Sequence, residues 1–190
     1  MRCPRFLFFA SIMLAAGCDA AAPAAQPGAA GTAAAPAAPA APALAGAGTR
    51  GGHFDLKDGA GAPLVVLFVR GSYCPLCVER LRALASYADA YGEAGARVVA
   101  VTLDPPDVAG ATARALDLPV PLVSVDAATF RRWGLWPAAF PVPRPGDFVL
   151  DGAGRVRYAR VGGEAADRAS DVALLGILDS LRAAGALPLR

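Results

Sequence analysis

The stretch of sequence that decides the fold runs from Leu64 to Cys77 and reads LVVLFVRGSYCPLC. The uninterrupted apolar run at residues 63–69 is typical of a strand buried on both faces. A helix is predicted to begin at Cys74 and Pro75, because the N–H that proline lacks would have no partner at the first helical position. The segment therefore predicts a buried strand that leads, through a short connection, into a helix with two cysteines at its start.

The residues that follow alternate between apolar runs and helix-like patterns. Gly95 is expected to end the first helix, and Asp151 to Gly154 read as the turn of a hairpin. Further strands are predicted at 97–103, 121–125, 147–150 and 156–159, and helices at 74–94, 106–116, 127–133 and 171–184. This order predicts an α/β sandwich in which a mixed sheet is flanked by helices.

The two cysteines are placed for thiol chemistry. Cys74 would lie at a helix N-terminus, where unpaired N–H groups and the helix dipole favour a thiolate. Cys77 lies one turn later, close enough to attack a disulfide formed at Cys74. Cys77 also shares the core-facing stripe of Leu81, Leu84 and Tyr91. The pattern predicts Cys74 as the attacking thiol and Cys77 as the resolving thiol.

Two other interpretations of the CxxC pair remain open. It could be half of a zinc site, although no second CxxC or CxxH is present to complete four ligands. It could also be an inert structural disulfide, whose short loop would stabilise the fold little. We expect no metal and no cofactor other than a redox-active disulfide between Cys74 and Cys77.

The N-terminus has the features of a secretion signal. Arg2 and Arg5 precede an apolar run at residues 6–16, which is too short to span a bilayer as a stable helix. The run ends in Leu-Ala-Ala-Gly-Cys, with Cys18 last, and this resembles a bacterial lipobox. Residues 1–17 are therefore predicted to be a lipoprotein signal peptide and Cys18 to be lipidated. A plain signal peptide or a short anchor is the alternative.

Residues 18–51 are predicted to be the lipidated cysteine and a disordered linker rich in alanine and proline, because scattered Pro and Gly interrupt every helical run. The folded domain is predicted at 52–190. The chain has 18 basic and 16 acidic side chains, a net charge of +2, which excludes a disordered polyelectrolyte and argues against a nucleic-acid partner. The predicted location is the extracytoplasmic, periplasmic face of a bacterial cell membrane.

Three segments, residues 64–77, 94–101 and 144–151, resemble the thioredoxin-fold superfamily. The resemblance covers nearly all of residues 52–190. It is greatest to the peroxiredoxin-like branch of the alkyl hydroperoxide reductase/thiol-specific antioxidant (AhpC/TSA, redoxin) family, and next to membrane-tethered thioredoxin-like lipoproteins. The resemblance implies a thioredoxin-like sandwich and an aromatic residue before the first cysteine, here Tyr73.

The resemblance also implies a cis-proline that faces the CxxC pair. Pro145 matches that position, with Pro141 and Pro143 as nearby alternatives. A cis bond there would expose the backbone of Arg144 to an incoming peptide. The Arg144 side chain would either add positive charge beside Cys74 or be an ordinary solvated loop arginine.

The departures from the family pattern bear on function. Typical peroxiredoxins place a Pro and a Thr or Ser before the reactive cysteine and an Arg at the cis-proline position. Here these positions hold Leu67, Gly71 and Pro145, so the peroxide-activating set is incomplete unless Arg70 substitutes in part. Residues 64–69 carry no carboxylate, so the buried acid of thioredoxins is expected to be missing. Glu79 is then one candidate proton acceptor.

These observations favour a membrane-tethered thiol–disulfide oxidoreductase acting on extracytoplasmic protein or small-molecule disulfides. The alternative is a peroxiredoxin-like thiol peroxidase that reduces hydroperoxides as an antioxidant. A copper-binding assembly factor is a third hypothesis. Such a factor normally has a histidine after its cysteine pair, whereas the single histidine here, His53, precedes the CxxC pair. The expected partners are a disulfide- or thiol-bearing protein or a hydroperoxide, a thiol protein that donates or accepts electrons, and the membrane. No nucleic-acid partner is expected.

Overall fold

The predicted buried strand is β3 (Leu64–Phe68) of the computed structural model, which describes residues 38–188. All five residues of β3 are buried. Val65 and Leu67 point into the apolar core on one face of the sheet, and Leu64, Val66 and Phe68 into the core on the other face. A strand with a core on each side has no position for a polar residue, which is why this run is continuously apolar.

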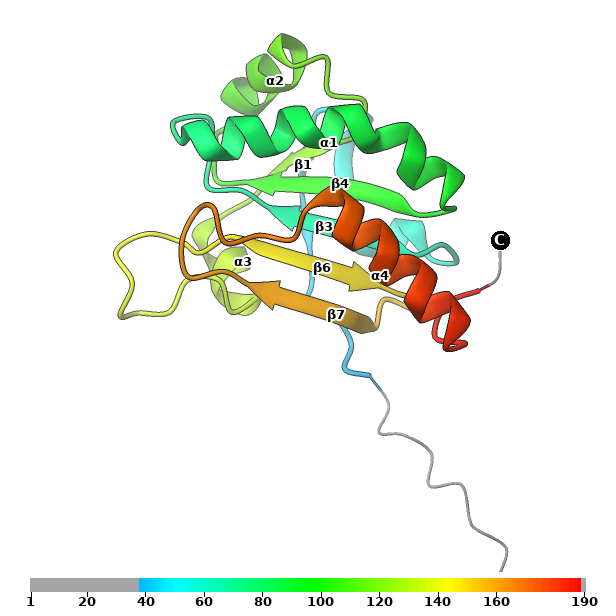
Figure 1. Cartoon of the computed structure of the whole chain (residues 1–190). Coiled ribbons are helices and arrows are strands. Elements are labelled where there is room, and N and C mark those ends of the chain that lie inside the picture. The colour runs from blue at the N-terminus through cyan, green and yellow to red at the C-terminus, as the bar shows by residue number, and fades with distance from the viewer. Residues whose placement is uncertain (1–37, 189–190) are drawn as a thin grey trace, which may run out of the picture. The chain divides into compact units, whose positions relative to one another are not determined.

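Seven strands form one mixed sheet with the order β2-β1-β5-β4-β3-β6-β7 (Figure 1). Strands β3, β4 and β5 are parallel, and β1, β2, β6 and β7 pair with their neighbours in the antiparallel direction. The other strands are β1 (Ala45–Gly48), β2 (Gly52–Asp55), β4 (Arg97–Thr102), β5 (Leu122–Ser124), β6 (Gly146–Leu150) and β7 (Val156–Val161). The helices are α1 (Pro75–Glu93), α2 (Pro106–Ala115), α3 (Ala127–Arg132) and α4 (Asp171–Ala183), with a short 3₁₀ turn at Leu56–Gly59. The predicted α/β sandwich is confirmed.

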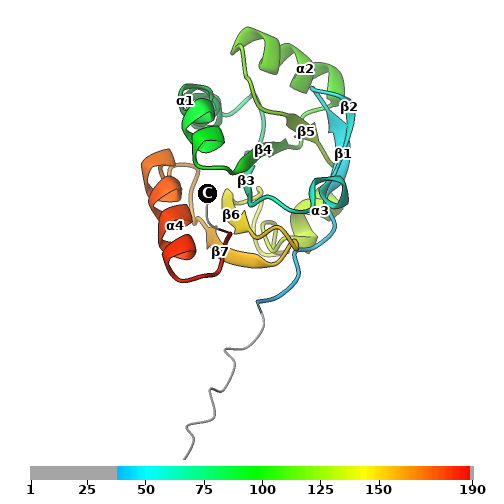
Figure 2. The same cartoon turned by 90° about the vertical axis from the view of Figure 1, so that its right-hand side faces the viewer.

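The two faces of the sheet are covered by different helices. Helices α1 and α4 lie on one face and α3 on the other (Figure 2). Ala109 and Ala113 of α2 belong to the same core as α1 and α4. On the α3 face, Phe68 packs against the rings of Phe130, Trp133 and Phe148 at centroid separations of 5.0 to 5.8 Å. The central strand is therefore held on both sides, and its C-terminal end is a fixed platform for the residues that follow.

The predicted domain boundary at residue 52 is wrong, because ordered structure begins earlier. Ala40 forms a bridge with Arg155, and β1 lies inside the sheet between β2 and β5. Leu44 is 1% exposed and fills the α3-side core. A Cβ at Gly46 would lie 2.2 Å from the carbonyl oxygen of Ser124. The small residues that suggest a linker are thus the ones that let this strand pass close to β5.

The predictions for the signal peptide, for Cys18 and for linker residues up to 37 lie outside the described residues. Within residues 38–188, no helix combines the length and apolarity that a membrane span requires.

Candidate active site

The two cysteines lie after β3, at the start of α1. Cys74 is the N-cap of α1, Pro75 is its first residue, and the amides of Cys77 and Val78 donate to the Cys74 carbonyl at 2.9 and 3.1 Å. Both cysteines are free thiols. Cys74 is 8% exposed and Cys77 is fully buried. Both thiols are therefore buried, and Cys74 at the helix start keeps slightly more exposure than Cys77.

The loop before Cys74 is held by a carboxylate that lies just beyond the end of β4. Asp104, after β4, accepts a hydrogen bond from the Ser72 amide at 2.7 Å, and its own amide donates to the Thr102 hydroxyl at 3.1 Å. A Cβ on Gly71 would lie 2.5 Å from Asp104 Oδ1 and 2.8 Å from the Tyr73 ring. Glycine is needed there because the loop packs directly onto that carboxylate, which positions Cys74.

A guanidinium group lies against the buried thiol. Arg168, in the loop between β7 and α4, places Nη2 3.7 Å from Cys77 Sγ. Its Nη1 donates to the carbonyl of Phe68 at 3.0 Å and its Nε to that of Ala165 at 2.8 Å. These two carbonyls fix the arginine beneath the cysteine pair. No local sequence signal identifies this residue, because it lies 91 positions from Cys77 along the chain.

Two opposing influences act on the Cys77 thiol. Burial, together with the hydrogen bond to Cys74, raises the pKa of Cys77. The Arg70 backbone and the Arg168 charge act in the opposite direction. Cys77 is therefore held mainly as a neutral thiol, with a cation beside it that favours the thiolate during reaction.

Tyr73 and Arg70 belong to the loop that precedes Cys74. The Tyr73 side chain is 67% exposed. Burial of part of the ring raises the pKa of Tyr73, and the charge of Arg70 nearby partly offsets this. Within the described chain, the buried Nε of Arg70 has no hydrogen-bond partner. The Arg70 backbone thus acts on Cys77, and its side chain holds a buried donor without a partner in the described chain.

The expectations for Arg144 and Pro145 are wrong. The structure has no cis peptide bond between residues 38 and 188, and the Arg144 amide already donates to the Leu135 carbonyl at 2.7 Å. The Arg144 guanidinium donates to the carbonyls of Gly162 at 2.6 Å and Val161 at 3.4 Å, and it lies over the Phe140 ring. Arg144 is committed to the end of β7, and Arg168 is the arginine that reaches the cysteine pair.

A buried carboxylate does lie near the site, which sequence reasoning missed because it searched only the strand before Cys74. Asp147 of β6 is 1% exposed and is paired in register with Leu67 of β3. Burial raises the pKa of Asp147, against the effects of the Ala169 amide and the Arg168 charge. Glu79, the acceptor considered from the sequence, is exposed on α1.

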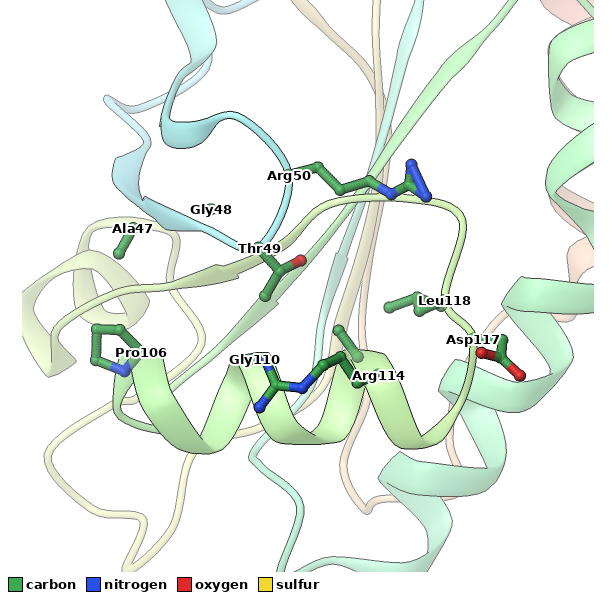
Figure 3. A pocket seen from close by; sticks show the side chains of 10 residues that line it. Ala47, Gly48, Thr49, Arg50, Pro106, Gly110, Arg114, Asp117 and Leu118 are labelled. Atoms are coloured by element: carbon green, nitrogen blue, oxygen red, sulfur yellow. The ribbon is translucent and has the colours of Figure 1, made fainter.

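A cavity of about 520 Å³ lies away from the cysteine pair, between the β1–β2 turn and α2 (Figure 3). Thr49, Arg50 and Arg114 are among its lining residues, and neither cysteine is. Within residues 38–188, no three His, Cys, Asp or Glu side chains group as a metal site requires.

Comparisons with known proteins agree with this geometry. Residues 37–159 match the model of the AhpC/TSA family. A reduced 2-Cys peroxiredoxin from Plasmodium vivax is 18% identical with a TM-score of 0.69, covering 77% of this chain and 81% of its own. Peroxiredoxin Q from Xanthomonas campestris is 20% identical with a TM-score of 0.62, covering 74% and 90%. Peroxidoxin BcpB from Mycobacterium tuberculosis is 18% identical with a TM-score of 0.64, covering 77% and 96%. The search of curated proteins found no match. At these identities the solved structures establish a shared fold.

Proposed function

The chain belongs to the AhpC/TSA family, and from that premise we propose that it is a thiol peroxidase that reduces hydroperoxides with Cys74 and Cys77. The observation that carries the proposal is the pairing of Cys74, which lies at the helix start and keeps 8% exposure, with the fully buried Cys77 against Arg168. The first suits a small oxidant that arrives from solvent. The second suits a thiol that reacts only with its neighbour.

The proposed cycle has three steps. The Cys74 thiolate attacks one oxygen of the peroxide, the O–O bond breaks, and Cys74 becomes a sulfenic acid while water or an alcohol leaves. The Cys77 sulfur then attacks the Cys74 sulfur, so that an S–S bond forms and the sulfenic oxygen leaves as water. A dithiol donor protein reduces this disulfide by thiol–disulfide exchange and is itself oxidised to a disulfide.

Two features of the loop support the first step. The charge of Arg70 acts at Tyr73, the residue beside Cys74, and can stabilise the negative charge that develops as the O–O bond breaks. Asp104, through the Ser72 amide, keeps the loop that carries Arg70 in one conformation. Arg70 thereby takes the place of the peroxide-binding residues that are missing at positions 67, 71 and 145.

Disulfide exchange with a protein substrate is the second candidate function. Tyr73 and Leu76, on either side of Cys74, are 67% and 44% exposed. An exposed apolar pair around a reactive thiol suits the docking of a polypeptide. The peptide-binding edge expected at Arg144 does not support this candidate, because the Arg144 amide is already bonded to Leu135.

The rate at which the reduced full-length protein loses its thiols to hydrogen peroxide separates the two functions. A peroxidase is expected to react at least about a hundredfold faster than a free thiol, which is the effect of one or two fixed donors on the reacting oxygen. A rate equal to that of a free thiol would overturn the peroxidase and leave disulfide exchange. Reduction of a model protein disulfide by the same sample is the parallel measurement.

We further propose that the chain is tethered to the membrane by lipid on Cys18, outside the cytoplasm. The support is the lipobox-like sequence that ends at Cys18, since acyl chains contribute about 0.8 kcal/mol per buried methylene to anchoring. In cells fed a labelled fatty acid, the protein is expected to carry label, and Cys18→Ser is expected to lose it. Cys3→Ser, in the segment predicted to be removed, is the matched control. An unlabelled wild-type protein would refute the tether.

A further inference from the structure

Asp147 is a buried carboxylate that the proposed cycle does not use. Its Oδ2 accepts a hydrogen bond from the Ala169 amide at 2.8 Å. Its Oδ1 is buried and has no hydrogen-bond partner among residues 38–188. A buried acceptor without a partner costs about 1–3 kcal/mol, so this carboxylate is not explained by the stability of the fold alone.

Asp147 anchors Ala169, which directly follows the active-site arginine, Arg168. The bond to the Ala169 amide ties the segment before α4 to β6, and Arg168 is the preceding residue. Arg168 forms no ion pair within the described chain, although the charges of both Cys77 and Asp147 act on it. The half-buried guanidinium thus lies 3.7 Å from the Cys77 sulfur, and the residue after it is hydrogen-bonded to Asp147.

The other cations near Asp147 already have carboxylate partners. Arg80 of α1 pairs with Asp171 at 2.5 Å, and Arg160 of β7 pairs with Asp167 at 2.5 Å. Their charges, with that of Arg168, are the ones that act on Asp147. On the other side, Cys77 faces Cys74, the Arg70 backbone and Arg168. Arg168 is thus the cation shared by both groups.

We propose that Asp147 is a positioning residue of the thiol site, which holds Arg168 beneath Cys77 and offsets part of its charge, so that the charge state of the carboxylate sets the reactivity of the buried thiol. When Asp147 is ionised, its negative charge opposes a thiolate at Cys77. When Asp147 is protonated, the positive charge of Arg168 acts on Cys77 without that opposition. The inference rests on the proposed function only in giving Cys77 the resolving role.

The direction of the pH effect follows from burial. Burial raises the pKa of Asp147, so its protonation begins at a higher pH than that of an ordinary aspartate. As the pH falls through that range, the repulsion on a Cys77 thiolate is lost. The acidity of Cys77 is therefore coupled to a group that titrates on a neighbouring strand, and the coupling offsets part of the loss of Cys77 thiolate that falling pH itself causes.

The test measures the pKa of Cys77 by thiolate absorbance in the full-length Cys74→Ser protein. Adding Asp147→Asn keeps an acceptor for the Ala169 amide and removes the charge, and is expected to lower the pKa of Cys77 by about half a unit. This is about a threefold rise in thiolate at a pH below the pKa. Adding Arg168→Met is expected to raise it by about one unit, and Arg168→Lys to raise it less.

Opposite shifts from the two substitutions distinguish this role from a purely structural one, which predicts loss of thermal stability without opposite changes in the pKa of Cys77. Asp89→Asn, at an exposed carboxylate further along α1, is the matched control and is expected to leave the pKa of Cys77 unchanged. An unchanged pKa of Cys77 in Asp147→Asn, or a rise, overturns the proposal. The readout needs no peroxide, so its failure is distinguishable from failure of the proposed peroxidase.

Discussion

Replacing Cys74 with serine is expected to abolish peroxide turnover, with a loss of at least about 10⁴-fold. The reason is accessibility: Cys77, the other thiol in the described chain, is fully buried and cannot meet a peroxide in solution. Cys77→Ser is expected to behave differently. It should react with one equivalent of peroxide at Cys74 and then stop, because no second thiol closes the disulfide.

Mass spectrometry after treatment with peroxide and a sulfenic-acid trap checks both outcomes. The Cys77→Ser protein should carry one trapped adduct on Cys74, and the Cys74→Ser protein none. An adduct on Cys77 in the Cys74→Ser protein would reverse the two roles. Sustained turnover by Cys77→Ser would remove Cys77 from the cycle. Loss of Cys74 disables both peroxidase chemistry and disulfide exchange, so loss of turnover in Cys74→Ser does not distinguish them. The trapped sulfenic-acid adduct is expected for the peroxidase alone and therefore separates the two functions.

Replacing Asp171 with alanine is expected to have the largest effect on stability, a loss of about 3–5 kcal/mol. Asp171 begins α4 and is 4% exposed. One of its oxygens pairs with Arg80 of α1 at 2.5 Å, and the other accepts from the Tyr91 hydroxyl at 2.9 Å. Arg80 is 8% exposed, and its Nε and Nη2 have no partner among residues 38–188. Without Asp171 it would be a buried charge with no counterion.

Urea unfolding of the variant, followed by circular dichroism, measures this loss. Asp167→Ala, which removes the acidic partner of the largely exposed Arg160 pair, is the control and is expected to lose far less stability. Replacing Arg80, Tyr91 and Asp171 together with apolar residues is expected to recover most of the loss, because no buried polar group is then left alone. Equal losses in Asp171→Ala and Asp167→Ala would contradict this account.

The features that could be predicted from the sequence are those encoded locally. Apolar runs and turn residues predict strand β3, helix α1 and the β6–β7 hairpin, and the observed bounds differ from the predicted ones by at most two residues. The CxxC pair is likewise local, since its spacing and position before a helix are visible in four residues. Helix phase also predicts that Cys77 lies on the core-facing stripe, and in the structure Cys77 is fully buried while Cys74 is 8% exposed.

The features that could not be predicted depend on contacts between distant segments. Arg168 and Cys77 are 91 positions apart, and Asp104 and Ser72 are 32 apart. Strand β1 has almost no apolar pattern because its Ala and Gly residues serve close packing against β5. The cis-proline expectation came from family resemblance, and it failed because the segment around Arg144 makes its own bonds to Leu135 and Gly162.

The place of β1 inside the sheet determines where the domain can be cut from the rest of the chain. A fragment that starts at residue 52 would lack Leu44 and would leave β5 with one side unpaired. Unpaired strand edges recruit other strands, so such a fragment would tend to aggregate. It would also leave β2 without the strand it pairs with. A fragment that starts before Ala40 keeps all of β1 and also the bridge from Ala40 to Arg155, which joins the start of the described residues to the β6–β7 hairpin.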